Sequence, residues 1–412
     1  MRDVRPHIVV LHRWRAAYAA YERYVDHGTH AVTYVTTDVG AEAVPESAAE
    51  VVVVPATDDL ARVRKEVDGL AQRHGPPRSV IALKEDDLLV ASHLAEEWDC
   101  RARRPDQVAL FRDKSLMVDA VARAGLAVPA TAPAPDAEAV RAFARDHGLP
   151  LIVKPTSGSS SEGVTLLRSA EDLDRLSFPE GARFLVQAHI PDAMYHVDGV
   201  FDGRDLLCWK SSRYLNDCLG FRAGNPVGSV EEDQPHIADA TACFATRVLR
   251  ALTRDPVPFH LELFVKERGT AAPECVFLEV GARVGGAEIP IVWRDVHGYD
   301  LMEAAFRIAL GEPPPPYAPP AERERGGFLL VPAPAARPCV ITAITPMTGR
   351  TPGPYAEDLL DVGDVLPDAD AYYEHVGGRF RFRGRTSAEV RRAITETARA
   401  FRVSGRSQGG AR

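Results

Sequence analysis

The residues PLIVKPTSGSSSEGV, 150–164, carry the strongest indication of the fold. Their apolar start predicts a buried strand that ends at Lys154, and the small residues that follow predict a loop in which Gly158 and Gly163 permit unusual backbone conformations. Backbone N–H groups and hydroxyls beside a lysine can surround a polyphosphate. The spacing differs from that of the usual P-loop. A flexible Gly/Ser linker is the alternative, but a buried lysine needs an anionic partner.

Two acidic residues lie in strands that follow one another along the chain. FHLELF, residues 259–264, alternates so that His260 and Glu262 share one face, and CVFLEVGAR, residues 275–283, is a second strand that contains Glu279. A hairpin between these strands would bring the two carboxylates together. Each carboxylate raises the pKa of the other, and a divalent cation such as Mg²⁺ removes the repulsion. Two glutamates on a solvated sheet face are the alternative.

Three further features are weaker on their own. Arg283 in GARVGG, residues 281–286, has a planar fork that suits phosphate or carboxylate, and Gly285 and Gly286 would let backbone donors approach a ligand. Lys114 stands near the first turn of a predicted helix, where anions are favoured. Isolated arginines and lysines of this kind are more often solvated surface charges.

Length and composition exclude several classes of protein. A chain of 412 residues predicts roughly two to four lobes, and 45% hydrophobic with 26% charged residues is an ordinary globular mixture. The net charge of −9 argues against a nucleic-acid partner. No apolar stretch is long enough to cross a bilayer, and the start of the chain is not a signal peptide. Six scattered cysteines without CxxC pairs predict a reducing, cytoplasmic location.

Hydrophobic periodicity divides the chain into lobes. The first hundred or so residues alternate strands and helices, which indicates a parallel sheet with helical crossovers. The strands are expected at 7–11, 31–36, 50–54 and 79–82, and the helices at 13–27 and 60–74. A small α+β lobe follows, with helices at 115–124, 137–147 and 171–176 and strands at 151–154, 164–167 and 183–187.

The second half of the chain reads differently. Residues 195–280 predict mainly antiparallel strands with a helix at 238–252, and another helix is expected at 300–310. The proline-rich run at 311–320 is the clearest linker. The C-terminal lobe is expected to contain strands at 327–331, 340–345 and 380–383 and a helix at 388–401, before a disordered tail.

In this order the pieces resemble the ATP-grasp superfamily, in particular its carboxylate–amine ligase branch, which includes L-amino-acid ligases and dipeptide synthases. The resemblance covers about residues 105–310. It is carried by RDK (112–114), LIVKPTSGSSSEGV (151–164), YHVDGVF (195–201), FHLELF (259–264) and FLEVGARVGG (277–286).

The resemblance implies an α/β and α+β architecture with an N-terminal parallel lobe, a small lid and an antiparallel catalytic lobe. The expected domains are an N-terminal α/β domain at 1–105, the lid at 106–190, the catalytic subdomain at 191–312, a C-terminal α+β lobe at 313–403 and a disordered tail at 404–412.

The resemblance also implies roles for individual residues. Glu262 and Glu279 would hold Mg²⁺ or Mn²⁺, and Lys154 and Arg283 would act in catalysis. ATP would contact Lys114, Lys154, Thr156, Ser157, Gly158, Ser159, Ser160, Ser161, Gly163, Val186, Gln187, Ala188 and Ile190. The substrate would contact Ser212, Arg213, His260, Arg283, Gly285 and Gly286.

Three positions depart from the pattern of the superfamily. Gln187 stands in the adenine hinge where relatives often carry an acidic residue, and Met194 replaces a frequent glutamate. Gly281 stands where many members place a metal-binding asparagine. These departures predict altered ribose or adenine contacts and weaker binding of a second Mg²⁺.

The activity that the resemblance implies is ADP-forming ligation of a small-molecule carboxylate to an amine through an acyl-phosphate, with amino acids as the expected substrates and a homodimer as the expected assembly. Two alternatives stay open. One is another ATP-grasp reaction, such as biotin-dependent carboxylation or ligation of a nucleotide precursor. The other is a non-catalytic nucleotide-binding protein, since a fold does not determine a function.

Overall fold

The N-terminal region forms a parallel sheet with helices on both faces. The structure, a computed structural model, describes residues 5–15, 18–159, 161–216, 218–267, 272–321, 323–334, 337–367 and 376–407. The first lobe contains β1 (His7–His12), α1 (Tyr21–Tyr24), β2 (Ala31–Thr36), α2 (Asp38–Ala41), β3 (Glu50–Val53), α3 (Leu60–His74), β4 (Pro77–Ala82) and α4 (Leu88–Glu97). The strand order is β3-β2-β1-β4, all parallel, as the alternation of strands and helices predicts.

Two predictions in this lobe are wrong. The helix expected at 13–27 is reduced to α1, because Arg13 turns away to bond Thr57 and the buried Asp87, which holds the chain in a non-helical path after β1. Helix α4 was not predicted. Its residues 90–92 are buried in succession, so it lacks the amphipathic stripe that reveals a surface helix.

The lid is a small antiparallel sheet with helices on one side. After α5 (Pro105–Ala109) it contains α6 (Lys114–Arg123), β5 (Thr131–Pro133), α7 (Ala137–His147), β6 (Leu151–Pro155), β7 (Thr165–Leu167), α8 (Ala170–Asp174) and β8 (Phe184–Ala188). The strand order is β5-β8-β6-β7. Val140, Phe143, Leu151 and Val186 form its own small core, so the lid is a separate packing unit.

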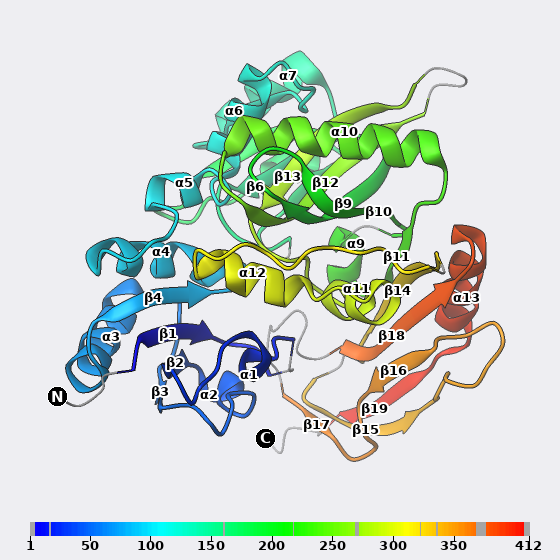
Figure 1. Ribbon diagram of the computed structural model, residues 1–412. Helices are drawn as coiled ribbons and strands as arrows, with labels where there is room; N and C mark the ends of the chain where they lie inside the picture. The colour runs from blue at the N-terminus through cyan, green and yellow to red at the C-terminus, as the bar shows by residue number, and fades with distance from the viewer. Residues whose placement is uncertain are drawn as a thin grey trace, which may run out of the picture.

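An eight-stranded sheet forms the centre of the molecule (Figure 1). Its strand order is β13-β12-β9-β10-β11-β14-β18-β16. The strands and nearby helices are β9 (Ala193–Phe201), β10 (Leu206–Tyr214), α9 (Cys218–Arg222), β11 (Val227–Glu231), α10 (Pro235–Leu252), β12 (Val257–Lys266), β13 (Glu274–Gly281), α11 (Ile289–His297), α12 (Leu301–Ala309), β14 (Arg325–Pro332), β16 (Ala356–Leu359) and β18 (Val376–Gly384).

The two faces of this sheet have different neighbours. Helix α10 packs on β9, β10, β12 and β13, while α11 and α12 lie on the side that faces the N-terminal lobe (Figure 1). The proline-rich segment 312–320 is neither helix nor strand, as predicted. Helix α11 was not predicted, although Pro290 in its first turn is well tolerated there.

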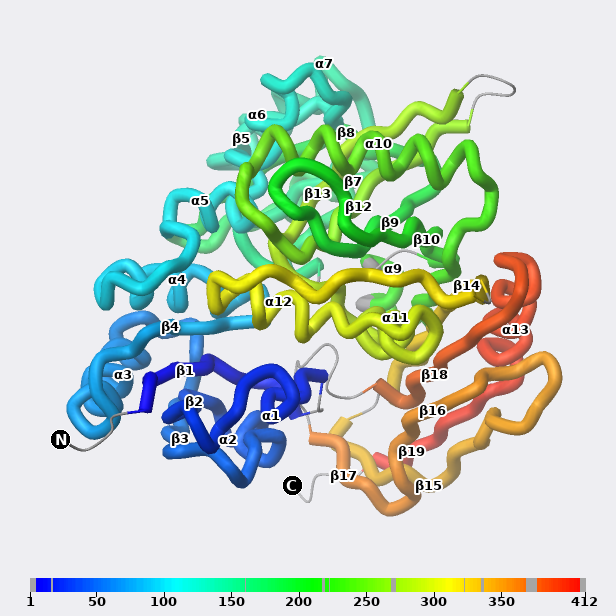
Figure 2. Tube along the Cα trace, in the orientation of Figure 1, coloured from blue at the N-terminus to red at the C-terminus, as the bar shows by residue number. Residues whose placement is uncertain are grey.

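The C-terminal region contributes to two sheets. Strands β14, β16 and β18 complete the central sheet, so the predicted boundary at 312 cuts through a continuous sheet. The remaining elements are β15 (Cys339–Ile344), β17 (Val365–Leu366), α13 (Ser387–Ala400) and β19 (Val403–Ser407). The predicted disordered tail at 404–412 is wrong for 404–407, because β19 pairs with β15 (Figure 2). Residues 408–412 lie outside the described residues.

None of the helices among the described residues is both long and apolar enough to cross a bilayer.

Candidate active site

A cavity of about 420 Å³ lies between the lid and the central sheet. One wall is β6 with the loop that follows it, the second is the segment after β8, and the floor is the β12–β13 hairpin. The predicted site residues that line it are Lys114, Lys154, Gly158, Ser159, Ser161, Gln187, Ala188, Ile190, Arg213, Glu262 and Glu279. Residues from six separate stretches of the chain therefore meet at one cavity.

The two predicted metal ligands face each other. Strands β12 and β13 pair antiparallel with Glu262 opposite Glu279, which confirms the predicted hairpin. Both residues line the cavity, and Glu262 is only 9% exposed. Paired carboxylates with lysines beside them form a donor set that suits Mg²⁺ together with phosphate oxygens.

Two lysines lie beside these carboxylates. The side chain of Asp113 accepts hydrogen bonds from Ser115 N and Leu116 N, so α6 begins with Lys114 at its first position. The Lys114 Nζ lies 3.7 Å from Glu279 Oε2 and donates to Gly158 O at 3.1 Å. Lys114 therefore joins the loop after β6 to the carboxylate of Glu279.

Lys154 is the second cation and is almost fully buried, with 4% exposure. Burial lowers the pKa of its ammonium to about 8, while Glu279 and Glu262 act in the opposite direction and Lys114 adds to the lowering. No salt bridge to Lys154 occurs within 4.0 Å among the described residues. A buried ammonium without a salt bridge is stabilised by an added anion, and the cavity beside Lys154 has room for one.

The carboxylate of Glu262 is held from two sides. Tyr214 Oη donates to Glu262 Oε1 at 3.0 Å, and His260 Nε2 lies 3.5 Å from the same oxygen. Burial raises the pKa of Glu262, but the contacts with His260 and Tyr214 outweigh it, and the pKa is lowered overall. The ionised form that a cation requires is thus favoured, through a tyrosine that the sequence did not single out.

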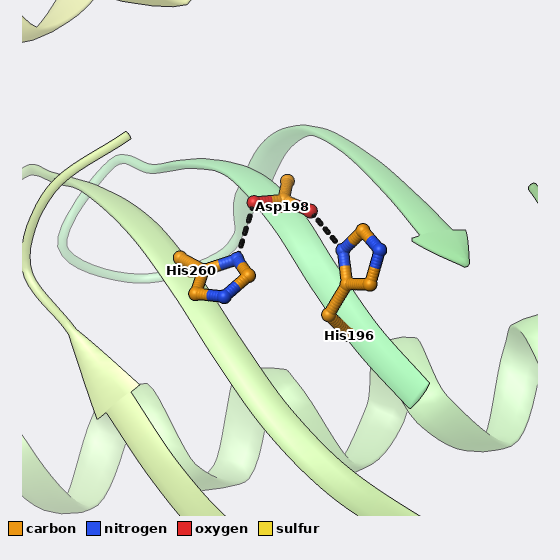
Figure 3. A group of neighbouring side chains, drawn as sticks. All are labelled: His196, Asp198 and His260. Atoms are coloured by element: carbon orange, nitrogen blue, oxygen red, sulfur yellow. Dashed lines mark hydrogen bonds and ion pairs between the residues drawn. The ribbon is translucent and has the colours of Figure 1, made fainter. Parts of the chain in front are cut away.

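His196, Asp198 and His260 form a buried cluster (Figure 3), which contacts Glu262 through His260. Asp198 on β9 bonds His196 Nδ1 at 2.5 Å and His260 Nδ1 at 2.7 Å, and His196 Nε2 lies 2.6 Å from Ser229 Oγ. The side chains of His196, Asp198 and His260 are of the types that bind transition metals. Each contacting ring nitrogen already has a protein partner, so hydrogen bonding accounts for the arrangement.

The electrostatics of this cluster follow from its burial. Burial lowers the pKa of His260, but the attraction of Asp198 outweighs it and raises the pKa to about 9. The two imidazoles in turn hold the pKa of Asp198 well below its usual range, against the effect of burial. Period-two alternation in YHVDG places His196 and Asp198 on one face, which is the signal that could have revealed them.

Arg283 lies in a different network from the cavity. Its Nε donates to Glu85 Oε2 at 2.8 Å, and Arg112 contacts the other oxygen of Glu85 at 2.6 Å. Burial raises the pKa of Glu85, but the two arginines outweigh it and lower the pKa to about 2. Arg283 does not line the cavity, so its predicted contact with a phosphoryl group or substrate stays a prediction.

Several other predicted residues also lie off the cavity wall. Val186 and Thr156 are buried, and Thr156 O accepts from Lys114 N at 2.7 Å. Gly163 has φ +68° and its absent Cβ would lie 2.8 Å from Pro155 Cγ, so this turn requires glycine. Ser157, Ser212, His260, Gly285 and Gly286 are likewise absent from the lining, and Ser160 lies outside the described residues.

The three departures from the superfamily pattern have clear positions. Gln187 and Met194 both line the cavity, and Gln187 Nε2 donates to Thr131 Oγ1 at 3.0 Å. The absent Cβ of Gly281 would lie 3.3 Å from Arg283 Cγ and Nε. A larger residue at 281 would therefore require the Arg283 side chain to shift.

Comparison with known proteins supports the fold. The L-amino acid ligase from Bacillus licheniformis superposes with a TM-score of 0.74 at 15% identity, covering 97% of this chain and 99% of that one. Phosphoribosylglycinamide synthetase from Anaerococcus prevotii gives 0.69 at 11% identity, over 97% and 99% of the chains. The biotin carboxylase domain of Hydrogenobacter thermophilus 2-oxoglutarate carboxylase, in complex with MgADP and bicarbonate, gives 0.64 at 14%, over 97% and 90%.

Comparison by sequence provides weaker evidence than comparison by structure. No family model matches the chain. An uncharacterized protein, y4rH, from Sinorhizobium fredii is 25% identical over 236 residues, which are 50% of this chain and 44% of that protein. The chain thus spans less than half the length of that relative. The structural likeness carries the assignment: the chain has the ATP-grasp fold.

Proposed function

We propose that this protein is an ATP- and Mg²⁺-dependent carboxylate–amine ligase. The observation that carries the proposal is the pairing of Glu262 with Glu279 at a cavity that also contains Lys114 and Lys154. Two carboxylates and two lysines around one cavity are complementary to a metal-bound triphosphate. The ATP-grasp fold supports the proposal, since L-amino acid ligase and MgADP-bound biotin carboxylase share it.

Each charged residue has a defined task in this proposal. Lys114 and Lys154 bind the phosphates, and Glu262 and Glu279 hold Mg²⁺, which when bound supplies neutralisation of charge on the transferred phosphoryl group. Tyr214 and His260 orient Glu262. The substrate carboxylate attacks the γ-phosphorus of ATP, ADP leaves, and an acyl-phosphate forms; an amine then attacks the acyl carbon and releases phosphate.

The loop after β6 is suited to close the site. Gly158, Ser159, Ser161 and Glu162 of this loop line the cavity, and Lys114 Nζ already holds the loop through Gly158 O. An acyl-phosphate must be protected from water, so a loop that covers the triphosphate has a direct chemical purpose.

Amino acids are the proposed substrates. Their support is the likeness to an L-amino acid ligase, together with Arg213 at the cavity wall, which can bind a carboxylate. A homodimer and a cytoplasmic location stay predictions.

The test is ADP release against an array of paired amino acids, with product masses measured afterwards. We expect ADP and a product equal to the two substrates minus water. ADP that depends on bicarbonate instead of an amine would replace ligation by carboxylation. Nucleotide binding without ADP under every substrate pair would indicate a non-catalytic protein.

A further inference from the structure

A second cavity lies at the junction of the N-terminal lobe and the central sheet, away from the nucleotide cavity. It has a volume of about 430 Å³ and lies between α4, β4, the end of α12 and the start of β12. Figures 1 and 2 show α4 and α12 next to each other at this junction. Among the described residues, the two cavities have no lining residue in common.

An arginine in this cavity lacks a partner. Arg103 lines the cavity, and its Nη1 is buried without a hydrogen-bond partner among the described residues. Among the described residues, no carboxylate lies within 4.0 Å of the Arg103 guanidinium. Burial lowers the pKa of Arg103 to about 10, and the more distant Asp255 opposes this only partly. Arg103 as a whole is half-buried, but its buried Nη1 lacks an acceptor, which an added carboxylate would supply.

The rest of the lining defines what else the ligand carries. Leu88 and Ala91 of α4 face the cavity together with Ile308 of α12, which makes one wall apolar. Asp255 lies at the cavity as well, where Gln107 Nε2 donates to its Oδ2 at 3.4 Å. A carboxylate that lines the same cavity as the arginine suits an ammonium group.

We propose that this cavity binds a free α-amino acid with an apolar side chain, as a site separate from the nucleotide cavity. The α-carboxylate would pair with Arg103, the ammonium with Asp255, and the side chain would pack against Leu88, Ala91 and Ile308. The volume of about 430 Å³ is ample for one amino acid. The inference is independent of the proposed ligase reaction, because it uses none of the residues at the nucleotide cavity.

Affinity measurements on the whole chain test this assignment. Calorimetric titration with L-leucine is compared with leucinamide, which lacks the carboxylate, with the des-amino acid, and with glycine, which lacks the apolar side chain. We expect leucine to bind and each of the three analogues to bind about tenfold or more weakly, as expected for the loss of one charge-assisted bond or one apolar contact. Equal binding of leucinamide and leucine would overturn the proposal.

Variants then locate the binding. Arg103→Met should weaken leucine binding by about tenfold to a hundredfold. Arg104→Met is the matched control, because Arg104 is exposed and pairs with Asp106 at 3.2 Å. Arg103→Met should also raise the melting temperature of the ligand-free protein, since it removes a half-buried charge without a paired anion. If that variant fails to fold, Arg103→Lys, which keeps the charge but loses the planar fork, should still weaken binding.

A heavy-atom label decides between the two cavities. Crystals soaked with p-bromophenylalanine should show the bromine anomalous signal between α4 and α12. A signal only in the nucleotide cavity, or no signal at all, would overturn the second site and leave the ligase proposal intact. A bromine signal between α4 and α12, in a protein that forms no ADP with any substrate pair, would support the second site and contradict the ligase proposal.

Discussion

The cavity between the lid and the central sheet and the histidine cluster beside Glu262 differ in how their charged residues are paired. In the cavity, Lys154 is buried with no salt bridge within 4.0 Å among the described residues, and Glu279 is contacted only at 3.7 Å by Lys114. In the cluster, Asp198 is bonded by both imidazoles. Charges whose partners are complete stabilise the protein, whereas charges that lack them indicate where a ligand binds.

This difference matters because the cluster has the composition of a metal site. Judged by residue type alone, His196, Asp198 and His260 would be better transition-metal ligands than two glutamates. Judged by free coordination positions, the glutamates are the better site for a hard cation. Measurements of catalysis and of stability distinguish a cation at the two glutamates from a metal at the histidine cluster.

The largest expected effect is on catalysis. Glu279→Gln should reduce ADP formation by about a thousandfold or more, because a neutral amide is a much weaker ligand than a carboxylate for the Mg²⁺ that neutralises the triphosphate. Steady-state ADP release at saturating Mg²⁺ measures it. Glu274→Gln on the same strand, at the Lys266 end of the hairpin, is the matched control and should keep normal turnover. Normal turnover in Glu279→Gln would refute the metal assignment.

The next effect is on stability and concerns the cluster. Asp198→Asn should lower the free energy of unfolding by about 3–5 kcal/mol, because it removes the anion of a buried ion pair and replaces the acceptor of one imidazole N–H by an NH₂ donor. Urea unfolding measures the change, with the exposed Asp239→Asn on α10 as control. A chelator should leave the unfolding midpoint of the wild type unchanged, whereas a chelator-induced loss of similar size would make the cluster a metal site.

A smaller effect is expected at the buried lysine. Lys154→Met should weaken ATP binding by about tenfold to a hundredfold through loss of a charged hydrogen bond. The same substitution should not destabilise the ligand-free protein, because it removes a desolvated ammonium. Calorimetric titration with ATP and thermal unfolding measure the two results, and Lys266→Met, which lies outside the cavity and pairs with Glu274, is the control. Unchanged ATP affinity would contradict the role of Lys154.

The smallest effect is a proton taken up with ATP. The pKa of Lys154 lies at about 8 in the ligand-free protein, below its ordinary value of 10.5. The ammonium is therefore charged below pH 8 and loses its proton above, while a bound phosphate raises the pKa again. Between about pH 8 and 10, ATP binding should take up a fraction of a proton and weaken as the pH rises. Titrations in buffers of different ionisation enthalpy measure the uptake, which Lys154→Met should abolish.

The sequence was most informative where local patterns decide the structure. The hairpin that pairs Glu262 with Glu279 follows from two alternating strands and a short connection, and the helices at 60–74 and 137–147 match the predicted boundaries. Period two and period 3.6 are properties of the chain itself. The lid loop, identified from glycine, serine and one lysine, does lie at the cavity.

The sequence was least informative where distant residues meet. Arg283 donates a hydrogen bond to Glu85, which lies 198 positions away in the sequence, so no local pattern could indicate this contact. The helix predicted from Arg13 onwards failed for a similar reason, since Asp87 holds the arginine. The cluster around Asp198 needed the pairing of β9 with β12 and of β11 with β10, so the alternation of His196 and Asp198 could be seen in the sequence but their contacts with His260 and Ser229 could not.

A crystal structure with Mn²⁺ and a non-hydrolysable ATP analogue tests directly whether Glu262 and Glu279 hold the cation of a bound nucleotide. We predict a manganese anomalous signal between Glu262 and Glu279, with the triphosphate next to Lys114 and Lys154. Manganese held instead by His196, Asp198 and His260, or a nucleotide bound away from the β12–β13 hairpin, would contradict it.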